Sequence, residues 1–292
     1  MIVHIVDGTF ELFRQYFARP SHINSEGKEV AATRAVLSGL LNMILDNATH
    51  IGVATDHVVE SFRNELYEGY KTGEGIEPGI ASQFEILEEG IELLGVKLCA
   101  MISHEADDGM ASMAQVALAD PNVEKTLLYT PDKDLAQCVV SGKVLQVDRR
   151  NNRTYDVQDV IEKHGVPPES IPDLLALKGD TADGFPGLKG WGAKSAATVL
   201  ARYGTIENIP LAAGQWDITV RSAPKLVETL KNNFDDAMLF KKLAILDAAV
   251  PTIDNVSELK WQGPKPEFYE FTKSIDAAEL SIKANKLAKN LT

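Results

Sequence analysis

Four short apolar segments of this chain each lead into acidic side chains. The segments, with the acids that follow them, are residues 2–6 with Asp7, 51–55 with Asp56, 96–101 with Glu105, Asp107 and Asp108, and 126–130 with Asp132 and Asp134. Apolar runs of this length that alternate with helical patterns are typical of a parallel sheet, whose ligands bind at the carboxyl ends of the strands. The sequence therefore predicts an α/β fold with acids gathered at one edge of its sheet.

The densest group of acids lies in residues 103–111, between an apolar run and a helical pattern. Glu105 and Asp108 are three residues apart and would share a helix face, with Asp107 beside them. One interpretation is that these acids only cap a helix and complement its dipole. The other is a metal site, because converging carboxylates would take up protons unless divalent cations kept them ionised. The acids at the other strand ends favour the metal site.

A second acidic segment leads into a glycine-rich turn. Asp180 and Asp183 are three residues apart, and the turn at residues 187–195 opens a helical pattern. Glycines let a phosphate approach backbone N–H groups at the start of a helix, and Lys189 and Lys194 add positive charge. Such a turn also joins helices that bind nothing, but its position after the two acids favours a phosphate-binding hairpin.

Two stretches rich in aromatic side chains carry isolated cations. Residues 61–73 contain Arg63 and Lys71 and end in glycine, which is expected of a mobile segment near a charged cleft. Spacing alone slightly favours the alternative, in which the aromatic side chains are core and the cations are solvated.

Arg14 lies two turns beyond Asp7. The motif that begins at Asp7 excludes a phosphatase of the haloacid dehalogenase kind, because Ile5 stands where the nucleophile would be.

The composition limits the partners and the compartment. The chain has 292 residues, and 45% of them are hydrophobic, which is enough for one large or two modest domains. A net charge of −13 argues against a nucleic-acid partner unless a basic footprint is local. Cys99 and Cys138 have neither disulfide density nor metal-ligand spacing. No apolar stretch reaches the ~20 residues of a membrane helix and no basic leader opens the chain, so we expect a cytoplasmic protein.

Ordered motifs give the chain a resemblance to a known family. They are Val6-Asp7-Gly8, Ser61-Phe62-Arg63 with Tyr70-Lys71, Glu105-Ala106-Asp107-Asp108, Asp132-Lys133-Asp134-Leu135, Gly179-Asp180 with Asp183, and Pro186-Gly187-Leu188-Lys189-Gly190-Trp191-Gly192. They resemble the 5′ nuclease family, which comprises flap endonucleases, 5′-to-3′ exonucleases and the N-terminal nuclease domain of bacterial DNA polymerase I. The match runs from Asp7 to about Leu246. No polymerase domain follows, so we expect a stand-alone member.

The resemblance implies a PIN-like α/β domain, with a twisted, mainly parallel sheet flanked by helices, and a helical domain with a helix-hairpin-helix. Together with the change of composition at Val166-Pro167-Pro168, it predicts a catalytic domain at 1–165, a DNA-binding domain at 166–262 and a helical tail at 263–292 that packs on the body. The expected activity is metal-dependent hydrolysis of DNA at 5′ ends, nicks or flaps, by a monomer.

The resemblance also implies roles for individual residues. One Mg²⁺ or Mn²⁺ ion would lie near the attacking water and be held by Asp7, Asp56, Glu105 and Asp107. A second ion or its waters would be held by Asp108, Asp132, Asp134, Asp180 and Asp183. The scissile phosphate or the threaded strand would contact Lys71 and Arg63, with Arg14 as a further cation. Duplex DNA would contact Gly187, Lys189, Gly190, Gly192, Ala193, Lys194 and Ser195. A K⁺ ion would be held by the main-chain carbonyls of Leu177, Lys178, Pro186, Leu188 and Trp191.

Two functions of different classes fit these motifs. The first is a metal-dependent DNA nuclease, and the second is a DNA-junction binding protein that holds a metal without cutting. The complete set of acids favours the nuclease, because a binder gains nothing from nine like charges beside a polyanion. Glu74 stands where the family often has an arginine, which predicts weak binding of the free strand unless Arg14 or Arg34 compensates.

Overall fold

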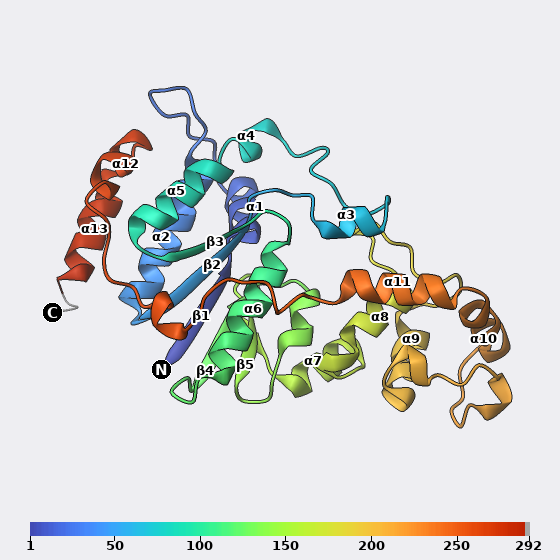
Figure 1. Cartoon of the computed structure of the whole chain (residues 1–292). Coiled ribbons are helices and arrows are strands. Elements are labelled where there is room, and N and C mark those ends of the chain that lie inside the picture. Colours follow the sequence, from blue (N-terminus) through green and yellow to red (C-terminus); the bar gives the residue numbers. More distant parts are fainter. Residues whose placement is uncertain (290–292) are drawn as a thin grey trace. The chain divides into compact units, whose positions relative to one another are not determined.

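The computed structural model describes residues 1–289 (Figure 1). The chain forms two compact units. Unit 1 comprises Met1–Val59, Gly73–Thr130 and Asp247–Thr292, and unit 2 comprises Glu60–Thr72 and Pro131–Leu246. The two units therefore interleave along the sequence. The domain boundaries expected at residues 165 and 262 divide the sequence in another way and stay a prediction.

Unit 1 is built on a parallel sheet. Its strands are β1 (Ile2–Asp7), β2 (His50–Asp56), β3 (Lys97–Met101) and β4 (Lys125–Tyr129), in the order β3-β2-β1-β4. The register places Ile5 of β1 opposite Gly52 of β2 and Leu128 of β4. The central strands are almost wholly buried, as expected of a parallel sheet that is covered on both faces. The predicted α/β class with a mainly parallel sheet is confirmed.

Helices cover this sheet and form the core of unit 1. They are α1 (Gly8–Ala18), α2 (Ala31–Leu45), α4 (Pro78–Ala81), α5 (Phe84–Leu94), α6 (Ala106–Ala119), the short η5 (Val256–Leu259), α12 (Phe268–Ser274) and α13 (Ala278–Ala288). Helix α6 packs across all four strands, while α2 and α5 pack on each other and on α12 and α13. The C-terminal segment thus contributes buried side chains, among them Phe268 and Ala284, to the same core.

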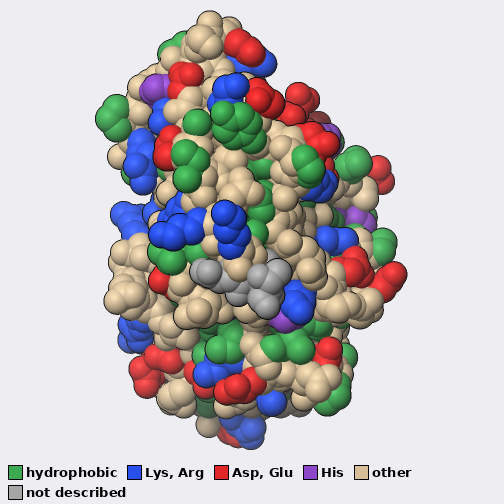
Figure 2. Space-filling view, turned by 90° about the vertical axis from the view of Figure 1, so that its left-hand side faces the viewer, with side chains coloured by type: hydrophobic (Ala, Val, Ile, Leu, Met, Phe, Trp, Pro, Cys, Tyr) green, Lys and Arg blue, Asp and Glu red, His purple; other side chains and the backbone are tan. Residues whose placement is uncertain are grey.

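The tail predicted at residues 263–292 consists of α12 and α13 as far as Lys289, and residues 290–292 lie outside the described part of the chain. Figure 2 shows the side of the molecule that carries these helices, where Lys and Arg side chains are mixed with Asp and Glu side chains. On α12, the charged atoms of Lys273 and Glu270 lie 3.1 Å apart.

Unit 2 contains two strands and a set of helices. They are α3 (Phe62–Leu66), η1 (Asp134–Cys138), β5 (Val144–Asp148), β6 (Arg153–Tyr155), α7 (Val157–His164), η2 (Pro168–Ser170), α8 (Ile171–Lys178), α9 (Ala193–Tyr203), η3 (Ile206–Asn208), η4 (Ala213–Gln215), α10 (Ala223–Asn232) and α11 (Phe234–Ala244). Strands β5 and β6 pair antiparallel. The core includes Phe185 and Phe240, whose rings stack with centroids 5.6 Å apart.

The predicted helix-hairpin-helix is α8, the turn at residues 179–192 and α9. Leu188 N donates to Leu177 O over 2.9 Å, so the turn folds back on the last turn of α8. Gly179 and Gly187 both have positive φ, and a Cβ at either position would overlap the backbone of the other strand of the turn. The close approach of two backbones therefore requires glycine at these positions.

Within residues 1–289, no helix has both the length and the apolar character needed to cross a bilayer. The longest, α2, has 15 residues.

Gly95 offers a test of the close packing in unit 1. It ends α5 with φ 79°, and a Cβ there would overlap the carbonyl oxygen of Gly263. Gly75 is the matched control, because its φ is 87° but a Cβ would meet nothing within 4 Å. We expect Gly75→Ala to lower the free energy of unfolding by about 1 kcal/mol from backbone strain alone, and Gly95→Ala by about 3 kcal/mol or more from strain plus overlap. Urea denaturation measures both, and equal losses would contradict the packing described.

Candidate metal centre and phosphate-binding hairpin

In unit 1, the acids at the strand ends are held by the backbone of neighbouring elements. Asp7 is the last residue of β1 and the N-cap of α1, and it accepts from Phe10 N at 2.7 Å and from Thr130 Oγ1 at 2.9 Å. Asp56 ends β2 and accepts from Ala106 N, the first residue of α6, at 2.8 Å. The carboxyl end of β2 is therefore joined to the start of α6, which is the edge of the sheet that the sequence predicts for the site.

The dense acidic segment forms the N-terminus of α6. Glu105 and Asp108 make a reciprocal capping box, in which Glu105 N donates to Asp108 Oδ2 at 3.0 Å. Asp108 is fully buried and also accepts from Asp247 N at 2.8 Å. The capping interpretation is therefore right for this residue, although a capping carboxylate retains lone pairs for another ligand. Asp107 lies on the first turn of α6 and is half-buried.

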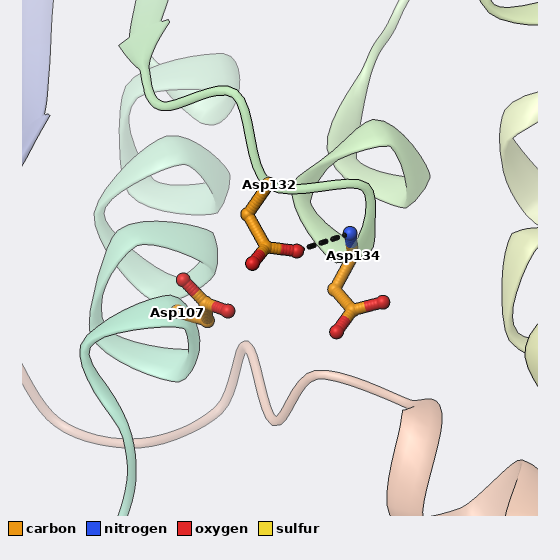
Figure 3. A group of neighbouring side chains, drawn as sticks. All are labelled: Asp107, Asp132 and Asp134. Carbon is orange, nitrogen blue, oxygen red and sulfur yellow. Dashed lines mark hydrogen bonds between the residues drawn. The ribbon is translucent and has the colours of Figure 1, made fainter. Parts of the chain in front are cut away.

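In unit 2, three acids from two segments converge. One carboxylate oxygen from each of Asp134, Asp180 and Asp183 lies within 4.8 Å of the others, and all three side chains are buried. Asp132 is attached to this group because Asp134 N donates a hydrogen bond to Asp132 Oδ1 at 2.9 Å. Figure 3 shows this hydrogen bond and, on α6, the side chain of Asp107. The structure thus brings together four of the acids that the sequence predicts as metal ligands.

Burial and mutual repulsion act strongly on Asp134. Burial raises its pKa well above the ordinary value of 3.8, and the neighbouring Asp132 raises it further. Its Oδ1 atom is buried and, within residues 1–289, has no hydrogen-bond partner. A buried, unpartnered carboxylate oxygen among other carboxylates is the donor set that oxygen-binding cations require. The residues therefore fit a divalent metal ion.

Cations of the chain also reach this group. Lys71 Nζ lies 3.0 Å from Asp183 Oδ1, and Lys71 N donates to Asp183 O at 3.0 Å. Lys133 Nζ lies 2.6 Å from Asp180 Oδ2. The segment around Lys71 is fixed by Asn64, whose side chain donates to Lys71 O at 2.9 Å. Of the aromatic side chains in this segment, Tyr70 belongs to the core, as the alternative interpretation proposed.

The two arginines assigned to phosphate binding have different surroundings. Arg63 is only 1% exposed, and it donates from Nε to Leu243 O at 2.8 Å and from Nη2 to Ile245 O at 3.0 Å. Its guanidinium therefore holds the C-terminal end of α11, which is a positioning role within unit 2. Arg14, in unit 1, pairs with Glu11 on the same helix. The phosphate contacts of both arginines stay predictions.

The five carbonyl groups assigned to K⁺ lie at the end of α8 and in the hairpin. Two of them already accept backbone hydrogen bonds, since Leu177 O accepts from Leu188 N at 2.9 Å and Leu188 O from Trp191 N at 3.0 Å. A carbonyl oxygen has a second lone pair, so these bonds leave the proposed ligation possible. The K⁺ site stays a prediction.

The hairpin lines a cavity of about 630 Å³ together with residues 219–222, a loop that the sequence analysis did not single out. Its lining includes Gly190, Lys194 and Ser195 of the hairpin and Thr219 and Arg221 of that loop. Lys194 and Arg221 are exposed. The available signal was a cation one residue before Ser222-Ala223-Pro224, a helix start with proline in its first turn.

A parallel sheet with acids at its carboxyl edge, a buried carboxylate cluster and a helix-hairpin-helix define the class of metal-dependent nucleases that act on nucleic-acid backbones. Residues 2–165 match the family described as 5′-3′ exonuclease, N-terminal resolvase-like domain, and residues 166–267 match 5′-3′ exonuclease, C-terminal SAM fold. The chain belongs to the 5′-3′ exonuclease family.

Relatives of two kinds support this assignment. A 5′-3′ exonuclease of Aquifex aeolicus (strain VF5) is 33% identical over 76% of this chain and 76% of its own length. A DNA polymerase I of Bacillus caldotenax is 31% identical over 90% of this chain but only 30% of its own length. The chain thus spans less than a third of that polymerase.

Solved structures share the fold. T5 5′-exonuclease with bound divalent metal ions (zinc) is 23% identical, with a TM-score of 0.65 over 95% of this chain and 100% of the other. The catalytic core of Rad2 in complex with DNA substrate is 17% identical, with a TM-score of 0.62 over 99% of this chain and 92% of the other.

The raised pKa of Asp134 predicts a pH-dependent stability. A carboxyl group whose pKa is higher in the folded than in the unfolded state stabilises the fold when protonated, and this stabilisation is lost as the pH rises through the folded pKa. In protein freed of divalent cations, we therefore expect Asp134→Asn to be more stable than the native chain by about 1 kcal/mol or more at pH 8, with a smaller difference near pH 4. Urea denaturation across this range measures the difference. The exposed Asp235→Asn is the control, and parallel curves for Asp134→Asn and the native chain would contradict the assignment.

Proposed function

We propose that this protein hydrolyses phosphodiester bonds of DNA at 5′ ends, nicks and flaps, using divalent cations held by its acids. The observation that carries the proposal is the buried Asp134, Asp180 and Asp183 cluster with Lys71 attached to it, in a chain of the 5′-3′ exonuclease family. Two lysine ammonium groups offset only part of the charge of these buried carboxylates, and bound cations would offset the rest.

Two groups of acids would hold two ions, Mg²⁺ or Mn²⁺. The acids of unit 1 assigned to the first ion are Asp7, Asp56, Glu105 and Asp107. Those assigned to the second ion are Asp132, Asp134, Asp180 and Asp183 of unit 2, with Asp108. When bound, a pair of such ions supplies an activated water and stabilises charge on the leaving oxygen.

The side chains of unit 2 would orient the scissile phosphate. Lys71 has an ammonium group 3.0 Å from Asp183, so a phosphate that reaches this cluster would meet a cation beside the carboxylates. An ammonium group at this place offsets the repulsion between the acids and the polyanionic substrate. The buried Arg63 keeps the segment that carries Lys71 attached to α11. We propose that Arg63 acts on the reaction through this attachment.

The hairpin would bind the duplex part of the substrate. Phosphates can approach the glycine-rich backbone at the start of α9, where Lys194 supplies charge, and a K⁺ ion on the hairpin carbonyls would add to the positive potential. Arg221 lines the same cavity as Lys194, so two segments of the chain offer a cation to one DNA backbone. A local basic site of this kind accommodates DNA despite the net charge of −13.

We further propose that the protein acts as a monomer in the cytoplasm. Cys99 and Cys138 are both free thiols, which suits a reducing compartment.

Loss of a metal ligand tests the proposed reaction. We expect Asp107→Ala and Asp132→Ala each to lower Mg²⁺-dependent cleavage of a 5′-flap substrate by about 100-fold or more, because the ions would be bound weakly or misplaced. Binding of the same DNA in Ca²⁺ should stay close to that of the native protein. Asp235→Ala is the control for an exposed acid. Cleavage by both ligand variants at the native rate would remove the metal-site proposal and leave a DNA-junction binding protein.

Salt dependence tests the hairpin. Removing one phosphate contact reduces the slope of log K against log salt concentration by about 1. We therefore expect Lys194→Ala and Arg221→Ala each to weaken duplex binding and to reduce this slope, while Lys273→Ala, whose cation pairs with Glu270 on α12, leaves the slope unchanged. Fluorescence anisotropy at several salt concentrations measures the slopes. An unchanged slope in Lys194→Ala would exclude a phosphate contact at that residue.

A further inference from the structure

Lys133 lies inside the carboxylate cluster of unit 2, between two of its acids in sequence. Its Nζ atom is 2.6 Å from Asp180 Oδ2 and 4.0 Å from Asp134 Oδ2. Its side chain is 26% exposed, so the ammonium group is largely removed from water. A lysine ammonium group is ordinarily charged at neutral pH, and the carboxylates beside Lys133 favour its charged form.

The charges of the cluster define what it can bind. Asp132, Asp134, Asp180 and Asp183 supply four carboxylates, and Lys71 and Lys133 supply two ammonium groups. With all four carboxylates ionised, these six groups carry a formal charge of −2, which favours binding of a cation. The distance from Lys133 Nζ to Asp180 Oδ2, 2.6 Å, is shorter than the 3.0 Å from Lys71 Nζ to Asp183 Oδ1. Within residues 1–289, Asp180 Oδ2 makes no hydrogen bond to a group other than Lys133.

We propose that Lys133 is a positioning residue that competes with the divalent cation for Asp180 and keeps the affinity of this cluster low in the absence of DNA. The proposal rests on the metal binding proposed above. An ammonium group a few ångströms from a divalent cation repels it, and this repulsion is strong because the surroundings are poor in water. The same ammonium group holds Asp180 in place among the other carboxylates.

Weak binding of the second ion has a consequence for the reaction. A DNA phosphate brings negative charge into the cluster and offsets the repulsion from Lys133, so the ion binds most favourably once the substrate is present. Binding of ion and substrate would then be coupled, and each would raise the affinity of the other by the same factor.

Calorimetric titration of the cation-free protein with Mn²⁺, without DNA, tests the competition. Lys133→Met removes the charge and keeps most of the side-chain volume, whereas Lys133→Arg keeps the charge. Lys231→Met, at an exposed position of α10 in the same unit, is the matched control. Asp180→Asn identifies which of the measured binding steps belongs to this cluster.

For the step that Asp180→Asn abolishes, we expect Lys133→Met to raise the Mn²⁺ affinity by about tenfold, as a loss of repulsion on the order of 1.4 kcal/mol gives. Lys133→Arg and Lys231→Met should leave it close to native. Unchanged or weaker binding in Lys133→Met, with circular dichroism showing an intact fold, would overturn the competition and leave Lys133 a purely structural partner of Asp180. If the native protein shows no step that depends on Asp180, the proposed metal site itself fails, which is a separate result.

Discussion

Repulsion between buried carboxylates is the constraint on which the site depends. Asp134, Asp180 and Asp183 are buried within 4.8 Å of one another, and the raised pKa of Asp134 shows how strongly burial and the neighbouring acids oppose its charge. Such a group persists in a fold only when cations or hydrogen-bond donors compensate it. Lys71 and Lys133 supply part of this compensation. The remaining negative charge is the physical basis for the proposed binding of metal ions.

Hydrogen bonds within unit 2 hold the segments that carry these acids and lysines. Arg63 ties a short segment, distant in sequence, to the carbonyls at the end of α11, and Asn64 fixes the backbone at Lys71. Asp180 is held at the base of a turn in which its backbone exchanges hydrogen bonds with Phe185 at 2.8 and 3.1 Å. The same turn continues into the hairpin that would bind DNA. A single run of residues therefore carries both the proposed metal ligands and the proposed phosphate-binding groups.

The sequence predicted the elements better than it predicted the contacts of individual side chains. The apolar runs before Asp7 and Asp56 are parallel strands, because a strand buried on both faces needs an unbroken apolar segment. Local spacing could not show that Arg63 points to the α11 carbonyls or that Lys133 reaches Asp180, because both contacts join segments far apart in the chain. Arg221 was missed for the same reason, since α9, η3 and η4 separate its loop from the hairpin turn in the sequence.

What the sequence determined by itself is the order of strands and helices, the acids at the strand ends and the hairpin glycines, since these follow from local periodicity and from backbone conformations that only glycine adopts easily. The tertiary structure alone decided which acids are buried together and which lysine compensates each of them. Electrostatic energies depend on distance and burial, and neither quantity is fixed until distant segments have packed against one another.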